Sequence, residues 1–506
     1  MPSTLRRLHH VDWTSPSGLV VAVGLLVVTF VSVQASADPD LWGHVRFGQG
    51  ILAAGAVVKA DPYSFTSDRE WVNHEWLAEV AMALAWNAGG TAGLVMLKAL
   101  LLLATLGLVG WAARREGVPS LAVWVLVVLA AVGVVPRATT VRPQLFSLLL
   151  FAAQLVILTE HERRGRRVLL LGLPPLYALW VNLHGGWLVG GAVLALWTAG
   201  HALERRGPVR DHVWRLSVGL LALVATLANP YGLGMWRFLA DTVGFGRTHI
   251  SDWQPVWEVP APLVSWAVAA AISGLLWIER CKPDTVTRPL LVLLLGIGSL
   301  KVNRLDAFFA LAATLALLPA FAQATKRLER RGHDPSRQQA VAPLLLCAAY
   351  LLAGAVTIDR VRTQVRCIPV AAEDGYPETE AVTWARDVGL KGRVLTFFNH
   401  GEFLIWHLAP DVKVSMDGRR ETVYTQAVVD EHARLYDTPA LGSDYAERVG
   451  ADFVWLPNSR GAARYLEARG WAPVFVGPTT TIFAREPAGP ASRADVPRTD
   501  RCFPGP

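Results

Sequence analysis

Long apolar runs alternate with short polar segments along the first 358 residues of the chain. A run of about 20 apolar residues can cross the hydrocarbon core of a bilayer as a helix, so the pattern predicts about eleven membrane spans. The predicted spans are 17–36, 91–113, 119–135, 143–158, 168–183, 186–202, 214–228, 262–278, 289–300, 305–322 and 341–358.

From about residue 360 the apolar runs shorten to the length of strands and alternate with helical patterns. The predicted strands are 393–398, 412–416, 452–456, 473–477 and 479–484, and the predicted helices are 378–389, 422–436 and 459–470. This alternation favours a small α/β domain with a largely parallel sheet. We therefore expect a transmembrane domain at 1–358, an α/β domain at 359–486 and a disordered tail, rich in Pro, Ala and Arg, at 487–506.

The composition supports a polytopic membrane protein with a soluble appendage. The chain is 52% apolar and 18% charged, with a mean hydropathy of +0.33, whereas a water-soluble chain would carry roughly a quarter charged residues. The formal net charge of +7 is compatible with binding to nucleic acid. However, the basic residues are scattered over six loops rather than gathered on one face, so we expect no nucleic-acid partner.

The basic residues concentrate in alternate loops. One set of loops holds about 20 of them in about 75 positions, and the other set holds about 9 in about 100 positions. The positive-inside rule then gives a cytoplasmic N-terminus and, with an odd number of spans, an extracytoplasmic C-terminal domain. Cys367 and Cys502 would both face an oxidising compartment, where a disulfide between them can form and tie down the tail.

The first outer loop, residues 37–90, carries seven acidic and three basic residues. Asp38 and Asp40 stand at the exit of the first span, where burying a carboxylate costs desolvation energy. If a helix starts after Pro39, Asp40 and His44 share one face of it. Asp38 would then be the N-cap, which explains Asp38 structurally and leaves Asp40 without a capping role.

A second short helix is predicted to open at residues 73–76 of the same loop. Glu75 can simply favour the helix dipole there. Alternatively, His74 and Glu75 converge with Asp40 and His44 into a base or a divalent-metal site. Asp40, His44 and Glu75 are the candidate metal ligands, although their spacing is not a standard zinc pattern.

Nine short motifs carry a resemblance to a known group of proteins and cover most of residues 37–425. They are DPDLWGH, DPYSFT, WVNHEWLAE, RPQLFSLLL, NLHGGWLVG, NPYG, ISDWQP, HGEFLIW and MDGRRE. Together with the long acidic first outer loop and the outer C-terminal domain, they resemble the GT-C glycosyltransferases, and more closely a group of bacterial membrane proteins. Many of those relatives carry a second Trp where this chain has Gly43.

The resemblance implies a polytopic α-helical enzyme of the bacterial inner membrane. Such an enzyme transfers a sugar, with inversion, from a polyprenyl-phosphate or polyprenyl-diphosphate carrier to a glycan, lipid or protein acceptor on the outer face. The acidic motif of the family matches Asp38 and Asp40, one of which would be the general base or a ligand of Mg²⁺ or Mn²⁺. His44, His74 and Glu75 would complete the site.

The phosphate leaving group of such a donor needs cations at the outer leaflet, and an Arg fork matches phosphate oxygens. The candidates are Arg137, Arg142, His184, Arg247 and Arg304. Arg137 and Arg142 can equally be snorkelling at span ends, and His184 can be a satisfied buried histidine. Arg304 lies with Lys301 in a tight outer hairpin, against the positive-inside bias, which favours a functional role.

Other functions fit parts of the pattern. A transporter or flippase of lipid-linked saccharide would carry ionisable residues at mid-membrane depth, and the predicted spans are nearly free of them apart from Lys98. A catalytically inactive scaffold in envelope glycan assembly would keep the fold. In the outer domain, 399–402 and 417–421 each follow a strand and can bind an acceptor or dock on the membrane domain, but no pattern there assigns chemistry.

Overall fold

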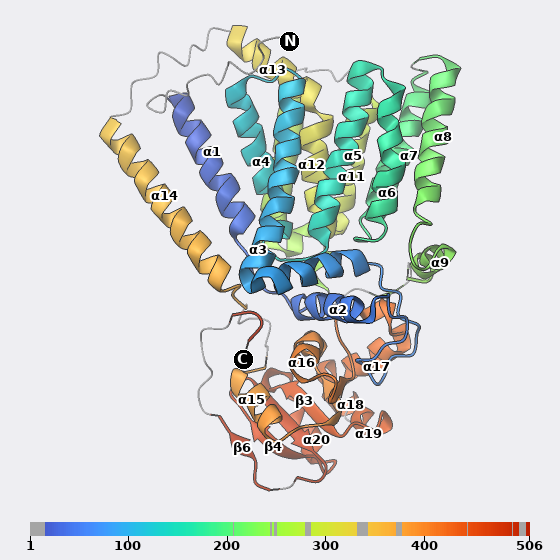
Figure 1. Cartoon of the computed structure of the whole chain (residues 1–506), viewed down its shortest axis with the longest axis vertical. Coiled ribbons are helices and arrows are strands. Elements are labelled where there is room, and N and C mark those ends of the chain that lie inside the picture. The colour runs from blue at the N-terminus through green and yellow to red at the C-terminus, as the bar shows by residue number, and fades with distance from the viewer. Residues whose placement is uncertain are drawn as a thin grey trace.

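The computed structural model describes residues 16–205, 207–242, 245–246, 250–278, 285–330, 343–370, 377–442, 444–487, 489–494 and 502–505. A bundle of long helices forms one part of the molecule, and a smaller α/β domain forms the other (Figure 1). Helix α2 (Leu41–Ala54) and the first part of α3 (Trp76–Arg115) lie across the boundary between the two parts.

Every predicted span overlaps a helix of the bundle. Besides α3, these helices are α1 (Pro16–Val33), α4 (Ser120–Ala138), α5 (Gln144–Arg164), α6 (Leu173–Trp180), α7 (Trp187–Leu203), α8 (Val209–Ala225), α10 (Pro260–Ile278), α11 (Thr287–Lys301), α12 (Asp306–Ala316), α13 (Leu318–Arg330) and α14 (Pro343–Arg366). By length and composition, α3, α4 and α5 can each cross a membrane, and the bent pair α12–α13 would make a fourth span among the described helices. The number eleven stays a prediction.

Helix α3 changes direction at Gly89 and Gly90. Gly90 has a φ of +55°, in the left-handed region that glycine adopts without a steric penalty. The part before this break lies beside α2 across the end of the bundle, and the part after it runs into the bundle (Figure 1). The predicted span 91–113 therefore starts at the break, and residues 76–88 belong to the first outer loop.

The outer domain contains a six-stranded sheet in the order β2-β1-β3-β5-β4-β6. The strands are β1 (Gly392–Thr396), β2 (Val412–Val414), β3 (Phe453–Pro457), β4 (Ala472–Val476), β5 (Thr480–Ala484) and β6 (Ser492–Arg493). Strand β1 is parallel to β2 and β3, but β5 is antiparallel to both of its neighbours, β3 and β4. The prediction of a largely parallel sheet was therefore wrong for this half, because the connection from β4 to β5 at 477–479 is long enough only for a hairpin.

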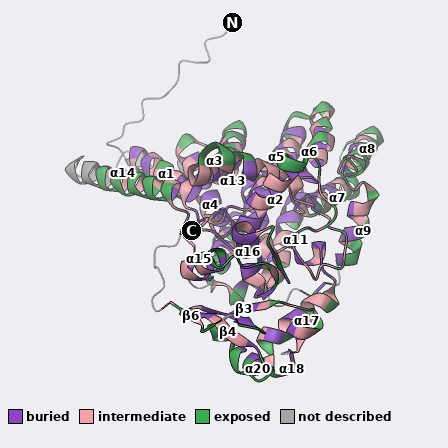
Figure 2. Ribbon diagram, turned by 60° about the horizontal axis from the view of Figure 1, so that its bottom comes forward, coloured by how far each residue is buried: buried purple, intermediate pink, exposed green. Residues whose placement is uncertain are grey.

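Helices cover both faces of the sheet. They are α15 (Thr379–Asp387), α16 (Gly401–Leu408), α17 (Gln426–Asp437), α18 (Pro439–Gly442), α19 (Tyr445–Arg448) and α20 (Ala463–Glu467). On one face, α17, α19 and α20 close a small core around Leu435, Tyr445 and Leu466. On the other face, α16 packs against α2 (Figure 2), and Phe403 shares a single core with Trp42. The outer domain is thus joined to the first outer loop by a continuous apolar core.

Arg419 strengthens this joint from the outer-domain side. Its guanidinium donates to Asp61 of the first outer loop at 2.7 Å and to Asp417 at 2.7 Å. It also lies over the ring of Trp71 at 4.7 Å, and such stacking is favourable for a desolvated guanidinium. Next to it, Ser64 forms a parallel bridge with Val414, the last residue of β2. Residues of the first outer loop therefore cover the exposed edge of the sheet.

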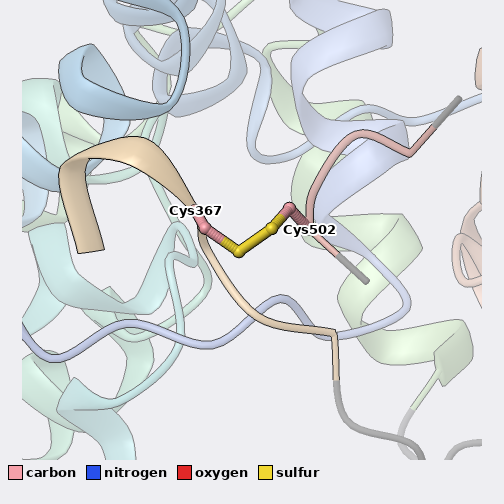
Figure 3. Close-up of a disulfide and its surroundings, with 2 residues drawn as sticks. All are labelled: Cys367 and Cys502. Atoms are coloured by element: carbon pink, nitrogen blue, oxygen red, sulfur yellow. A yellow bond between two sulfur atoms is a disulfide. The ribbon is translucent and has the colours of Figure 1, made fainter. Parts of the chain in front are cut away.

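The described part of segment 487–506 is ordered, so the expectation of a disordered tail was wrong for these residues. Strand β6 extends the sheet, and Cys502 forms a disulfide with Cys367, which follows α14 (Figure 3). Phe503 is buried against Trp42, whose Nε1 donates to the carbonyl of Pro504 at 2.7 Å. A covalent bond and a buried ring offset the chain entropy that composition alone predicts to dominate.

Removal of the disulfide should destabilise the folded protein. The bond joins residues 135 positions apart, and closing a loop of this length stabilises a fold by about 5 kcal/mol in the chain-entropy model. We expect Cys367→Ser and Cys502→Ser to lower the thermal unfolding midpoint in detergent by equal amounts, and the double variant by no more than either. A further loss in the double variant would contradict this, because both single changes open the same loop.

Candidate functional site

The helix connections on the side of the outer domain surround one cavity of about 550 Å³. Most of the predicted site residues line it: Asp40, His44, His74, Glu75, Arg142, His184 and Arg304. They come from the start of α2, the segment before α3, the residue pair before α5, the turn between α6 and α7, and the short helix η4 (Asn303–Leu305). Asp38 and Arg137 are not among the lining residues. Arg247 lies outside the described residues.

Arg142 is the centre of an ion-pair network at the cavity wall. Its guanidinium bonds to Asp38, to Asp40 Oδ2 at 2.8 Å and to Asp252 Oδ2 at 3.1 Å. Burial alone would lower the pKa of Arg142, but the three carboxylates outweigh it and raise the pKa, so the guanidinium stays charged. Burial raises the pKa of Asp38 to about 6, against the effect of Arg142.

The two acids of the first outer loop have different roles. Helix α2 begins at Leu41, and its N-cap is Asp40. The prediction that Asp38 is the N-cap was therefore wrong. Asp38 Oδ1 instead accepts a hydrogen bond from the backbone N–H of Asp40 at 3.2 Å, within the turn before the helix. The Asp40 side chain makes no capping bond and is 28% exposed. Of the two carboxylates, only Asp40 therefore borders the cavity.

Arg137 lies behind the cavity wall. Its buried guanidinium bonds to Asp252, to Asn303 and, at 3.1 Å, to Asp306. It thereby fastens two short helices, η2 (Ser251–Trp253) and η4, against the end of α4. With these contacts, the Arg137 side chain does not snorkel at a span end, and it does not line the cavity.

Glu75 and two histidines form a second group on the wall. Glu75 Oε1 lies 3.5 Å from His74 Nε2 and 3.6 Å from His184 Nε2. Burial alone would raise the pKa of Glu75, but its positive neighbours, led by His74, lower the pKa well below its usual range. The pKa of His74 is raised, because its pairing with Glu75 outweighs burial. This pair therefore forms a partly buried contact between an imidazole and a carboxylate.

His184 is a neutral imidazole that supports Arg304. Its Nε2 lies 3.1 Å from Arg304 Nη2, and its Nδ1 lies 2.7 Å from Ser147 Oγ. A neutral ring that carries its proton on Nδ1 donates to the Ser147 hydroxyl and accepts from Arg304 through Nε2. Burial, together with the charge of Arg304, outweighs Glu75 and lowers the pKa of His184 to about 3.

Arg304 differs from the other two outer arginines in its partners. Its guanidinium lies 6.0 Å from the ring centre of Trp253 and beside His184. Among the described residues, no carboxylate lies close enough to the Arg304 guanidinium, within 4.0 Å, to form an ion pair with it. Arg304 therefore presents a partly buried positive charge to the cavity, whereas Arg137 and Arg142 are paired with carboxylates.

His44 pairs with Glu79 rather than with the residues predicted to join it. Its Nδ1 lies 3.5 Å from Glu79 Oε1, and Asn73 Nδ2 donates to the other oxygen of Glu79 at 2.6 Å. Burial alone would lower the pKa of His44. The bond to Glu79 and the charges of Glu75, Glu79 and Asp40 outweigh burial and raise the pKa to about 9.

Comparisons with known proteins identify the fold. No family model and no curated protein sequence matches the chain, but solved structures do. ArnT from Cupriavidus metallidurans, bound to undecaprenyl phosphate, aligns with a TM-score of 0.58 at 15% identity over 94% of this chain and 99% of that chain. The oligosaccharyltransferase AglB from Archaeoglobus fulgidus, in complex with an inhibitory peptide and a dolichol-phosphate, aligns with a TM-score of 0.57 at 11% identity, over 91% of this chain and 72% of its own. The chain has the GT-C fold. The sequence resemblance to GT-C proteins is thereby confirmed at the level of the fold.

The candidate metal ligands do not form a metal site within this GT-C fold. A second AglB structure, in complex with Zn and sulfate, aligns with a TM-score of 0.54 at 12% identity, over 92% of this chain and 73% of that chain. In this chain, Asp40 contacts Arg142, His44 contacts Glu79, and Glu75 contacts two imidazoles. No group of three or more His, Cys, Asp or Glu residues within the described ranges could hold a metal ion.

The sequence did not predict several residues that contribute to the cavity and its wall. Asp252 joins Arg137 to Arg142, Glu79 holds His44, and Glu402 of α16 reaches the cavity from the outer domain. Asp252 and Glu402 lie within the motifs ISDWQP and HGEFLIW, so the resemblance marked their segments. The position after a strand marked the segment 399–402, which contains Glu402, as one that can bind an acceptor or dock. Nothing in the local pattern marked the partners of these three side chains, because each contacts a residue far away in the sequence.

The stability of the protein should depend on pH through His44. The folded-state pKa lies near 9, above the ordinary 6.5, so the stabilisation is fully present below pH 6.5 and is lost as the pH rises through 9. It amounts to about 3 kcal/mol at most. We expect His44→Gln to lower the thermal unfolding midpoint at pH 6.5 and to have little effect at pH 10. A difference from wild type that stays constant over this range would disprove the assignment.

Proposed function

We propose that this chain is an integral membrane glycosyltransferase that transfers a sugar, with inversion, from a polyprenyl-phosphate or polyprenyl-diphosphate donor to an acceptor on the outer face. One observation carries the proposal. A single cavity between the helix bundle and the outer domain contains the Asp40 carboxylate and the Arg304 guanidinium, which has no carboxylate partner among the described residues. The shared fold with ArnT, bound to undecaprenyl phosphate, and AglB, bound to dolichol-phosphate, supports a lipid phosphate as the donor.

In this proposal, Arg304 binds the phosphate of the donor. A buried guanidinium forms short, charge-assisted hydrogen bonds with phosphate oxygens and stabilises the negative charge that grows as the phosphate leaves. His184 holds Arg304 at the cavity wall through its Nε2. Arg142 lines the same cavity and, although paired, would add its charge to the binding field for the phosphate.

Asp40 would be the general base. Its carboxylate takes the proton of the acceptor hydroxyl or amide while the acceptor atom attacks the anomeric carbon of the sugar. The bond from that carbon to the phosphate oxygen breaks at the same time, and the polyprenyl phosphate leaves with the electron pair. Asp38 is fully engaged with Arg142 and the turn before α2, so its role would be to position Arg142. His44, His74 and Glu75 would bind the polar groups of the sugar.

Lys98, the ionisable residue in the middle of a predicted span, does not support the alternative of a transporter. Lys98 Nζ donates to the carbonyl oxygens of Val31 at 3.1 Å and Ser32 at 2.9 Å. These carbonyls belong to the last turn of α1, where a cation satisfies otherwise unpaired acceptors. A structural role therefore accounts for Lys98.

The substitution Asp40→Asn should abolish transfer and leave folding intact. Loss of a general base slows a reaction by about 10²–10⁴-fold. A deletion strain complemented with wild type or variant would be compared by mass spectrometry of its surface glycans and glycoproteins. The exposed outer-domain residue Asp411, which pairs with Lys391, provides the matched control Asp411→Asn, which should restore the wild-type profile. Full restoration by Asp40→Asn would refute the role given to the Asp40 carboxylate.

The substitution Arg304→Gln should weaken binding of the lipid phosphate. Loss of a charge-assisted bond to a phosphate, about 1.5–3 kcal/mol, corresponds to roughly 10–100-fold in affinity. Native mass spectrometry with undecaprenyl phosphate as the probe would measure this affinity. Arg434→Gln, at an exposed position on α17, should bind as wild type does. Equal affinity in wild type and Arg304→Gln would remove the basis of the proposed phosphate site, and the absence of any binding by wild type would favour a catalytically inactive scaffold.

A further inference from the structure

Glu402 is a buried carboxyl group that reaches from the outer domain to the proposed base. It lies in the first turn of α16, is 3% exposed and lines the cavity. Its Oε2 accepts a hydrogen bond from the backbone N–H of Gly43 in α2 at 3.1 Å. A carboxyl group buried this deeply needs either a cation or a proton.

Two glycines make room for this carboxyl group. A Cβ atom at Gly43 would lie 2.1 Å from Glu402 Oε2, so no side chain fits there while Glu402 keeps its place. A Cβ atom at Gly418 would lie 2.3 Å from Asp40 Oδ1 and 2.7 Å from Glu402 Oε1. One oxygen of each acid therefore borders the same small volume, which a side chain at position 418 would fill.

The charges around Glu402 do not neutralise a second carboxylate there. The acids Asp40, Asp417 and Glu79 act on it, and Arg419 is the opposing cation. Arg419 already bonds to Asp417 and to Asp61. Arg142 bonds to Asp40 through Oδ2, the other oxygen of that carboxylate. Burial, then the charges of Asp40 and Asp417, raise the pKa of Glu402 well above its usual range.

We propose that Glu402 is a positioning residue of the transfer site, whose protonated carboxyl group donates a hydrogen bond from Oε1 to Asp40 Oδ1 and fixes the orientation of the base. This inference rests on the proposed function of Asp40. Glu402 Oε2 remains the acceptor for Gly43, so the group spans from α16 to α2. The outer domain then supplies part of the active site and does more than bind the acceptor.

The isosteric variant Glu402→Gln tests whether the carboxyl group of Glu402 is protonated. Its amide oxygen can accept from Gly43 and its NH₂ group can donate to Asp40, so it imitates the protonated acid. We expect Glu402→Gln to retain transfer within about tenfold of wild type, and Glu402→Ala to lose at least a hundredfold, consistent with loss of an oriented base. Equal loss in both variants, or no loss in either, would overturn the proposal.

Gly418→Ala gives a second variant if Glu402→Ala does not fold. The added methyl group would occupy the space of the two carboxyl oxygens and separate Asp40 from Glu402. We expect it to lose transfer as Glu402→Ala does, with wild-type binding of undecaprenyl phosphate. Wild-type transfer by Gly418→Ala would count against the contact between the two acids.

Infrared spectroscopy tests the shared proton without any assay of transfer. At pH 8, Asp38, with a pKa of about 6, is ionised. The proposal predicts a C=O stretching band of a protonated carboxyl group in wild type that disappears in Glu402→Gln. The matched variant Glu447→Gln should keep the band, because bonds from Trp471 and Arg469 hold the pKa of Glu447 below its usual range. If Glu402→Gln keeps the band, the proposal for Glu402 fails, whether or not the protein transfers a sugar. If wild type shows the band but transfers no sugar, only the proposed transferase function is refuted.

Discussion

The guanidinium of Arg142 brings together three carboxylates that would otherwise repel one another. Asp38 and Asp40 precede α2, and Asp252 lies in the long segment before α10. Removing one partner from such a partly buried network leaves an uncompensated charge, which is destabilising. Arg142 therefore helps to fix the start of α2, the start of α5 and the helix η2 relative to one another.

The second group of charges depends on this arrangement. With η2 held by Arg137 and Arg142, the ring of Trp253 lies beside Arg304. Arg304 in turn contacts His184, which lies near Glu75. The chain thus separates its cations into two kinds. Arg137 and Arg142 hold the fold through ion pairs, while Arg304 keeps its charge for the cavity, and only the structure could distinguish them.

The sequence predicted what depends on local pattern. Hydropathy located a helix at each predicted span, and the acids and histidines of the first outer loop lie at the cavity, because both signals come from neighbouring residues. Glu402 was out of reach, since its contact with Gly43 joins positions 359 residues apart. The same holds for Phe503, which packs on Trp42 far away in the sequence. The antiparallel strand β5, in contrast, follows from the short local connection at 477–479. The reason for Gly43 became visible only beside Glu402, whose carboxyl group occupies the space of a side chain at this position.

The hydrogen bond from Trp42 to Pro504 has a consequence for the order in which the protein matures. It joins residues 462 positions apart, one at the start of the first outer loop and one beyond the outer domain. Synthesis of nearly every helix and strand in between must precede this contact. The packing around Trp42 of α2 is therefore completed late, after the ribosome has passed the α/β domain.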